Sequence, residues 1–352
     1  MTYYSKDQKM SWQYRLINDI FSIEEDNNCS ISTLDFPNMS EIKKKHCPYS
    51  LHKFYAPTIE NVSDVQNKLL WLASPDTFND PYDCYLTFDS DEFERYYTIK
   101  ALKKTAIFTK EQKNIIYRTS NKIYTNSFSY QFGKIVENAN KKSIKSFEKK
   151  LWQKRSQVRQ YIQSRISDKY RIACFSSYFW DTKNYEQLMW AHYAHSHKGF
   201  CVEYDISPLF DERVEDKDLL PYYSILKKDG FLHSFEQRRL MINGFFPVQY
   251  SSKQVEVPKT LCYAISKGSC DKKQICDINI KAFRAIITKQ LPWQYEQEWR
   301  LVVDSYVSER VNHKIPFPFA KKIIVGIKAS DELKRILSDT AKMLDIPINV
   351  FL

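Results

Sequence analysis

Short runs of apolar and aromatic residues, each bounded by Pro, Asp, Asn or Ser, recur along the chain and predict β-strands. The predicted strands cover residues 69–74, 170–176, 199–206, 247–250, 299–303 and 322–327. From residue 322 onward the pattern predicts a strand, a helix and a second strand. A crossover of that length allows the two strands to be parallel.

One segment has the period of a helix. Apolar residues recur three or four positions apart from Ile144 to Ile166, and Lys and Arg fill the positions between them. This pattern predicts a long amphipathic basic helix, preceded by one or two shorter helices between about residues 91 and 136. The chain is therefore expected to be α+β, with a mixed sheet and a helical insertion. The expected parts are an N-terminal extension (1–48), a core domain (49–90 and 170–352) and the insertion (91–169).

The net charge of +11 belongs to this insertion. Residues 100–171 hold 19 Lys and Arg against four acids, so the rest of the chain is slightly acidic. Such a helix fits a nucleic acid or an acidic protein partner, although a solvated amphipathic face has the same pattern. The residues expected to meet a partner are Lys149, Lys150, Lys154, Arg155 and Arg159.

The composition excludes several classes of protein. Six glycines are too few, and wrongly placed, for a GxGxxG dinucleotide loop or a GxxxxGK[ST] phosphate loop. The eight cysteines form no CxxC pair, so we expect reduced thiols in a cytoplasmic protein and no zinc site. No apolar run approaches the roughly 18 residues that span a bilayer, so no membrane partner is expected.

Polar residues cluster at three places that could have a chemical role. In the first, residues 72–84, Asn79, Asp80 and Asp83 could cap their own turns or form a polar loop over a ligand. In the second, residues 174–205, the spacing of His192, His195, His197 and Cys201 matches no common zinc signature. Those histidines fit the core or a loop, and His192 and His197 are the ones preferred for hydrogen bonding to a ligand.

The third cluster is residues 291–303. If this stretch is extended, Glu296, Glu298 and Arg300 share one face of a strand. This could be a solvated face with a weak Glu298–Arg300 pair, worth about 0–1 kcal/mol, or a row of groups for catalysis.

These motifs together resemble the bacterial domain-of-unknown-function family 2971. The matching stretches are LHKFYA (51–56), SPDTFNDPYDC (74–84), IACFSS (172–177), LMWAHYAHSHKGFCVEYDI (188–206) and WQYEQEWRLV (293–302). The resemblance covers about residues 50–330 and implies no activity by itself.

The order of the motifs also resembles ADP-ribosyltransferases, in which a basic first strand, a serine strand and an ExE turn follow one another. This resemblance implies a split-sheet core and NAD as substrate, with the protein acting as a toxin or antiphage effector that transfers ADP-ribose or hydrolyses NAD. Glu298 would stabilise the oxocarbenium ion, Glu296 would activate the acceptor, and Ser176 would hold Glu298 or the ribose. The implied NAD-binding residues are His52, Lys53, Tyr55, Asn79, Asp80, Asp83, His192, His197 and Arg300, with Phe175 or Trp299 as further stacking groups.

Two other functions remain open from the residues. One is a nucleic-acid-binding protein, or a phosphodiesterase or nuclease that holds Mg²⁺ with Asp80, Asp83, Glu296 and Glu298. The other is a non-enzymatic scaffold or sensor. In each enzymatic case, the three polar clusters are expected to meet in one pocket, because unpaired polar groups beside core aromatics cost about 1–3 kcal/mol.

Overall fold

A computed structural model describes residues 39–102, 109–111, 113–114, 141–177, 183–216 and 234–351. The chain forms two compact units. Unit 1 comprises Met1–Asp83, Ser167–Ser252 and Ile287–Leu352, and unit 2 comprises Cys84–Ile166 and Lys253–Ile286. Unit 2 thus includes a second segment, Lys253–Ile286, besides the predicted helical insertion. Most of the predicted N-terminal extension lies outside the described residues.

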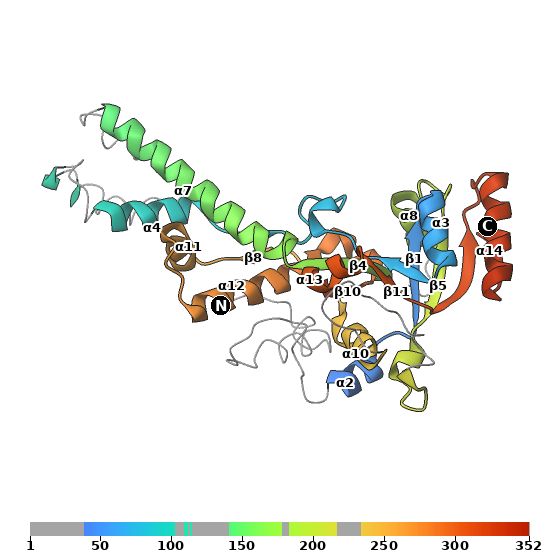
Figure 1. The fold of residues 1–352 in the computed structure, drawn as a ribbon. Helices are drawn as coiled ribbons and strands as arrows, with labels where there is room; N and C mark the ends of the chain where they lie inside the picture. The colour runs from blue at the N-terminus through green and yellow to red at the C-terminus, as the bar shows by residue number, and fades with distance from the viewer. Residues whose placement is uncertain are drawn as a thin grey trace. The chain divides into compact units, whose positions relative to one another are not determined.

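A mixed seven-stranded sheet forms the centre of unit 1 (Figure 1), which confirms the α+β class. The strand order is β13-β12-β5-β1-β4-β10-β6. Strands β12 and β13 are parallel, an arrangement that the length of the predicted crossover allowed, and the other neighbours are antiparallel. The strands are β1 (Ser50–Tyr55), β4 (Tyr170–Ser176), β5 (Phe200–Asp205), β6 (Phe245–Pro247), β10 (Glu298–Asp304), β12 (Ala320–Val325) and β13 (Ile348–Val350).

The sheet is nearly divided between β1 and β4. These two strands are paired at one position, His52 opposite Ser176, whereas β1 is paired with β5 at six positions and β4 with β10 at seven. Ser176 is also opposite Glu298 on β10. His52, Ser176 and Glu298 therefore form one row across three neighbouring strands, and directly opposed residues project to the same face.

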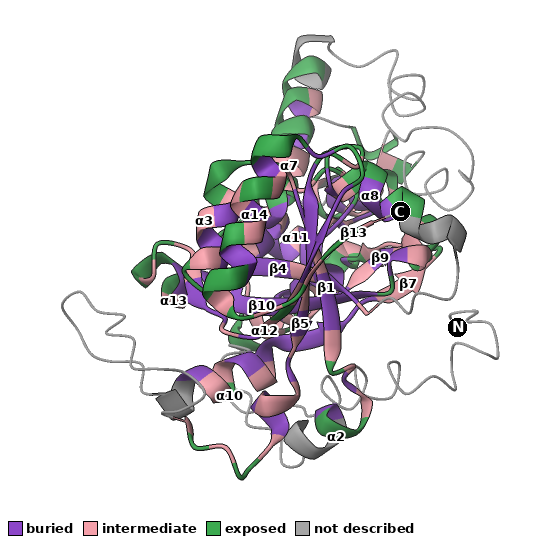
Figure 2. Ribbon diagram, turned by 90° about the vertical axis from the view of Figure 1, so that its right-hand side faces the viewer, coloured by how far each residue is buried: buried purple, intermediate pink, exposed green. Residues whose placement is uncertain are grey.

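The other face of the sheet covers the main hydrophobic core. Phe175, Trp299 and Leu301 alternate with the polar row and pack there. Helices α3 (Ile59–Gln66), α10 (Ser234–Gly244) and α14 (Asp331–Leu344) supply further residues of this core, and the strands are buried throughout their centres (Figure 2).

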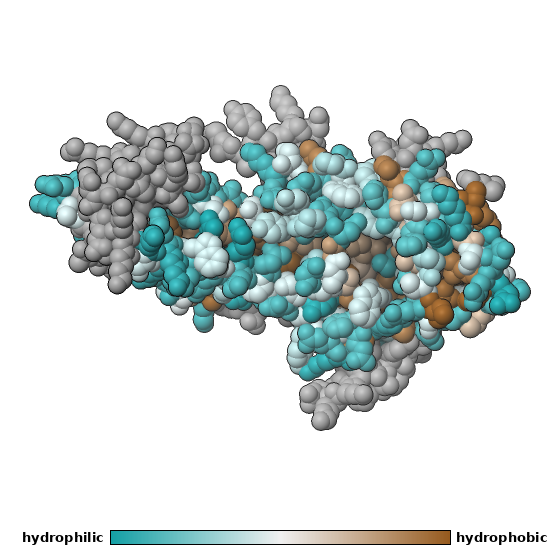
Figure 3. Space-filling view, turned by 90° about the horizontal axis from the view of Figure 1, so that it is seen from above, coloured by the Kyte–Doolittle hydropathy of each residue, from teal (hydrophilic) through white to brown (hydrophobic). Residues whose placement is uncertain are grey.

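Helix α14 shows how the sequence specifies these contacts. Ser330 caps its N-terminus by accepting a hydrogen bond from the Leu333 backbone, and Leu333, Leu337 and Ala341 recur at helical spacing on its buried side. The opposite side of α14 is exposed and includes Met343. Hydrophobic surface gathers at the end of unit 1 that carries α14 (Figure 3).

Shorter elements complete unit 1 around the sheet. They are α2 (Met39–His46), β2 (Leu69–Trp71), η3 (Pro75–Thr77), α8 (Lys183–Tyr193), η4 (Ser207–Phe210), β7 (Gln249–Ser251), β9 (Thr288–Gln290), η5 (Leu291–Glu296), α13 (Ser305–Arg310) and β11 (Lys314–Pro316). Helix α8 packs on the face that carries the polar row, where Trp190 and Ala194 meet Cys201 and Ile324 in a small second core. This second core holds α8 beside the polar row.

Unit 2 contains the long basic helix α7 (Lys141–Ser167), which the periodicity predicted. Its buried residues include Phe147, Leu151, Val158 and Ile162. Tyr97 of α4 (Ser90–Leu102) lies 5.8 Å from Tyr263 of α11 (Lys259–Lys267), measured between ring centroids. The remaining elements of this unit are β3 (Leu86–Thr87), β8 (Val255–Glu256) and α12 (Lys272–Ile286).

We expect Gly199→Ala to destabilise unit 1 by about 3 kcal/mol, the upper end for overpacking. A Cβ atom at position 199 would lie 2.0 Å from the Tyr55 carbonyl oxygen, so the backbone would have to move. Chemical denaturation measures the effect. The control is Gly268→Asn in unit 2, where a Cβ atom meets nothing within 4 Å and Asn tolerates the left-handed backbone. Equal stability of the two variants would contradict the packing at Gly199.

Candidate functional site

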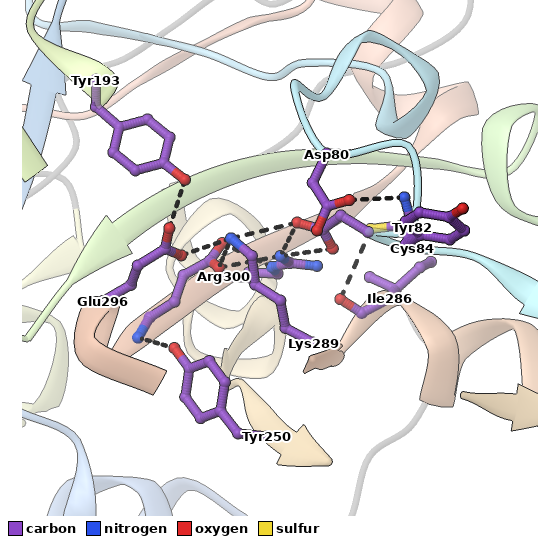
Figure 4. Close-up of polar contacts among 11 residues, drawn as sticks. Asp80, Tyr82, Cys84, Tyr193, Tyr250, Ile286, Lys289, Glu296 and Arg300 are labelled. Carbon is purple, nitrogen blue, oxygen red and sulfur yellow. Dashed lines mark hydrogen bonds and ion pairs between the residues drawn. The ribbon is translucent and has the colours of Figure 1, made fainter. Parts of the chain in front are cut away.

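Arg300 is the centre of a buried group of charges beside the polar row (Figure 4). Its side chain is fully buried, and its Nη2 donates to both carboxylate oxygens of Asp83, at 2.9 and 2.7 Å. The same guanidinium donates from Nε and Nη2 to the two oxygens of Glu298, at 2.7 and 3.0 Å. The alternative of a solvated strand face with a weak Glu298–Arg300 pair is therefore wrong, because Glu298 is only 5% exposed.

Lys289 on β9 joins the remaining carboxylate to this group. Its Nζ lies 2.5 Å from Glu296, 3.1 Å from Glu298 and 3.4 Å from Asp83. We call Asp83, Lys289, Glu296, Glu298 and Arg300 the charge cluster. It contains three anions and two cations, and Lys53 adds a cation nearby.

The turn that carries both glutamates is not extended, contrary to the sequence prediction. Residues Leu291–Glu296 form the 3-10 helix η5, and Gln297 is in the left-handed region at φ 42°. Glu296 precedes Gln297 in the sequence and Glu298 follows it. Because the chain turns at Gln297, both carboxylates accept a hydrogen bond from Lys289 Nζ. A left-handed non-glycine residue is strained, and such residues concentrate at functional sites.

Strand β4 holds this turn in place. Ser176 Oγ donates to the Glu296 carbonyl at 2.6 Å, and Ser177 Oγ donates to the Gln297 carbonyl at 2.9 Å. The resemblance to ADP-ribosyltransferases implied that Ser176 holds Glu298 or the ribose. In the structure Ser176 Oγ supports the backbone of the turn instead of the Glu298 carboxylate.

Two tyrosines that sequence analysis did not single out complete the site (Figure 4). Tyr193, at the end of α8, donates to Glu296 at 2.5 Å. Tyr250 on β7 accepts from the Glu298 backbone N–H at 2.8 Å. Lys289 was missed as well; its sequence signal is a lone cation inside the apolar stretch that precedes the ExE turn.

The near-division of the sheet brings β1 to the same site. Lys53 Nζ crosses from β1 and donates to the Cys174 carbonyl on β4 at 3.3 Å. Burial lowers the pKa of Lys53, while Cys174 and Glu298 work against this decrease. Burial also lowers the pKa of His52, so its imidazole is neutral at neutral pH.

The pKa values of the two glutamates are shifted in opposite directions. Burial works against ionised Glu298, but Arg300 and Lys289 outweigh it and hold the pKa of Glu298 below its usual range. Burial and the charge of Glu298 raise the pKa of Glu296 to about 7, although Lys289 and Tyr193 donate to it. Lys289 stays protonated, because the three carboxylates overcome its burial and raise its pKa. Near neutral pH, Glu298 is thus ionised while Glu296 gains or loses a proton. Such a difference between the pKa values of two neighbouring carboxyl groups is typical of acid–base pairs.

Residues 189–301 match the family model described as protein of unknown function (DUF2971). The match confirms the resemblance to this family over these residues, and the stretches 51–56, 74–84 and 172–177 lie outside it. The DUF2971 segment includes every member of the charge cluster except Asp83, and it also includes Tyr193 and Tyr250. No curated protein and no solved structure matches the chain significantly.

The DUF2971 segment also contains the histidine-rich stretch, but His197 lies apart from the charge cluster. Its ring stacks on Trp190 and Phe351 in the second core, at 6.0 and 6.1 Å between centroids. Residues His195, Ser196 and His197 are left-handed, and their backbone leads into Gly199, where β1 approaches closely. The backbone of the stretch therefore has a structural role, and the ring of His197 lies in the second core and not at the charge cluster.

The side chains of other predicted ligand residues are not part of the charge cluster, although the Asp80 carbonyl accepts a hydrogen bond from the Asp83 backbone N–H at 3.0 Å. Asp80 accepts from the Tyr82 backbone within its own turn, and Asn79 is exposed. His192 is exposed and lies 5.8 Å from Trp293, between ring centroids, at the edge of the site. The residues implied to stack on nicotinamide, Tyr55, Phe175 and Trp299, belong to the main core instead. Phe175 and Trp299 neighbour Ser176 and Glu298 in sequence, and neighbours along a strand point to opposite faces.

The three polar clusters of the sequence contact one another at the charge cluster, through the expected residues Asp83, Glu296 and Glu298 and the unexpected Tyr193. Asp83 comes from the FNDPYD loop, Tyr193 lies between His192 and His195 in the second polar cluster, and Glu296 and Glu298 come from the ExE turn. The carboxylates of Asp83, Glu296 and Glu298 contact Arg300 or Lys289. Within the described part of the chain, no group of three His, Cys, Asp or Glu side chains is arranged to hold a metal ion. The Mg²⁺ alternative therefore has no supporting geometry among these residues.

The predicted partner residues on α7 divide into two groups. Lys154 donates to the Ser266 carbonyl at 2.7 Å, and Arg155 forms a 3.0 Å ion pair with the buried Glu94. These two side chains contact other segments of unit 2. Lys149, Lys150 and Arg159 are exposed.

Two sequence expectations outside the site also have an outcome. The described cysteines Cys47, Cys84, Cys174, Cys201, Cys262 and Cys270 are not disulfide-bonded. Cys276 is disulfide-bonded, so the expectation of reduced thiols is wrong for that residue. Among the described helices, none is both long and apolar enough to cross a membrane.

Proposed function

We propose that unit 1 breaks the bond between nicotinamide and ribose in NAD, either as an NAD glycohydrolase or as an ADP-ribosyltransferase. The observation that carries the proposal is the row of His52, Ser176 and Glu298 across β1, β4 and β10. It brings the basic strand, the serine strand and the ExE turn together at the near-division of the sheet, in the order in which they occur in the chain.

The properties of the two glutamates fit this chemistry. Cleavage of the glycosidic bond develops positive charge on the ribose, and an ionised carboxylate stabilises that charge. Glu298 is ionised at any pH near neutral. Glu296 can remove a proton from water or from an acceptor, because its pKa lies close to neutral pH.

NAD must displace a contact before it can reach Glu298. Both oxygens of this carboxylate are occupied, by Arg300 and by Lys289. Arg300 is held on two sides by Glu298 and Asp83, whereas Lys289 has a flexible side chain and a longer contact with Glu298, at 3.1 Å. We infer that Lys289 turns from Glu298 to the pyrophosphate of NAD, which carries negative charge that an ammonium binds well.

Incubation of the purified chain with NAD tests the proposal. Chromatography is expected to show released nicotinamide. NAD labelled in its adenylate part then distinguishes the two reactions, because a transferase labels a macromolecule and a glycohydrolase yields free ADP-ribose. A toxin or defence effector would also lower cellular NAD on expression.

We expect the rate of nicotinamide release to rise with pH through about 7. Glu296 has a raised pKa, so it is protonated and inactive as a base below that value and ionised above it. The Glu296→Gln variant should lose this rise. A wild-type profile that is flat between about pH 5 and 9, or the same rise in the variant, would show that Glu296 is not the base.

A further inference from the structure

The exposed side of α7 carries a tryptophan among cations. Lys145, Lys149, Trp152, Ser156 and Arg159 are separated by four, three, four and three residues, so they share one face of the helix. We call this set the tryptophan stripe. It extends over about 21 Å at 1.5 Å per residue. The apolar residues Phe147, Leu151 and Val158 lie on another face and are buried in unit 2.

Trp152 is the unusual member of the stripe. Its side chain is 59% exposed, although aromatic residues of this size usually contribute to a core. Helix α7 has enough buried apolar residues to dock without it. Most of the Trp152 side chain thus lies outside the buried face of α7, and its exposed ring is available for stacking.

The charges around Trp152 are uncompensated in the described part of the chain. Lys145, Lys149 and Arg159 are exposed and form no ion pair among the described residues. By contrast, Lys154 and Arg155 on neighbouring faces of the same helix bind Ser266 and Glu94. The single acid of α7, Glu148, is half-buried beside the stripe.

We propose that the tryptophan stripe binds single-stranded nucleic acid. The three cations would contact phosphates, and the indole ring would stack on an unpaired base, an interaction worth about 1–3 kcal/mol per base. An acidic protein would satisfy the cations but gives no reason for an exposed indole at their centre. A duplex keeps its bases stacked on one another, so its phosphates would meet the cations while Trp152 would have no partner.

Fluorescence anisotropy with a labelled single-stranded oligonucleotide, using the full chain, tests this proposal. Trp152→Ala should weaken binding by about 5–150-fold, and Trp152→Phe should retain most of the affinity, because phenylalanine also stacks. The triple variant K145Q/K149Q/R159Q should lower the slope of log K against log salt by about 2, since each single-strand phosphate contact contributes about 0.7.

The control removes three exposed cations from unit 1, in the triple variant K328Q/R335Q/K342Q. It has the same net charge as the stripe variant and should bind like the wild type. Equal affinities of Trp152→Ala and wild type would overturn the proposal, and so would equal losses in the two triple variants. Tighter binding of the matching duplex, or equal competition by poly-glutamate, would assign the surface to duplex DNA or to an acidic protein instead.

Discussion

Replacing Arg300 with Gln is expected to destabilise unit 1 by about 3–5 kcal/mol. The side chain is fully buried and satisfies Asp83 and Glu298 together, so its loss leaves two carboxylates buried with less compensation. Lys289 contacts both carboxylates but at longer distances, and it also neutralises Glu296. Urea denaturation followed by circular dichroism measures the change in the free energy of unfolding.

Two variants serve as comparisons for Arg300→Gln. Arg213 also binds one carboxylate with two nitrogens, but its side chain is 89% exposed, so Arg213→Gln should leave stability unchanged within error. Arg300→Lys keeps the charge and loses the planar fork, so its stability should fall between wild type and Arg300→Gln. If Arg300→Gln unfolds at the same urea concentration as Arg213→Gln, the charge cluster does not stabilise the fold.

Much of the sheet could be predicted because its strands have strong local signals. Residues 170–176 form β4 with the predicted limits, since this run is apolar and bounded by polar residues. The length of the intervening helix allowed β12 and β13 to be parallel but did not determine this arrangement. The long helix α7 was visible because its apolar residues repeat over many turns.

The burial of the charge cluster could not be predicted from local patterns. Arg300 and Asp83 are 217 residues apart in the chain, and nothing near either residue indicates that they pair. An ExE-x-R sequence is typical of an exposed strand face unless cations from other elements compensate for burial. Lys289 provides this compensation from β9, and a lone lysine carries little sequence signal.

The histidine side chains of residues 192–197 suggested a ligand site, but the backbone conformation of this stretch has a clear structural role. Three consecutive left-handed residues, 195–197, follow α8 and lead to Gly199, where a Cβ atom would meet the Tyr55 carbonyl. Position along the sequence cannot distinguish a histidine that stacks in a core from one that binds a ligand. The neighbouring Tyr193, without any motif of its own, is the residue that reaches Glu296.

Glu298→Gln is expected to lower nicotinamide release by about 10²–10³-fold, the usual effect of removing one group that stabilises transition-state charge. The substitution keeps the size of the side chain and removes its negative charge. It will also reduce stability, because Glu298 is buried between Arg300 and Lys289. This cost is smaller than for Arg300→Gln, since both cations keep a second carboxylate.

Nicotinamide release by Glu298→Gln, compared with Glu94→Gln, tests the central claim most directly. Glu94 is a buried carboxylate with an arginine partner in unit 2, so its substitution is a control for the loss of a buried charge pair. Rates are compared at a temperature at which circular dichroism shows all proteins folded. The account predicts that Glu94→Gln cleaves NAD at the wild-type rate and Glu298→Gln does not. Equal release by the two variants, or no release by the wild-type protein, would contradict it.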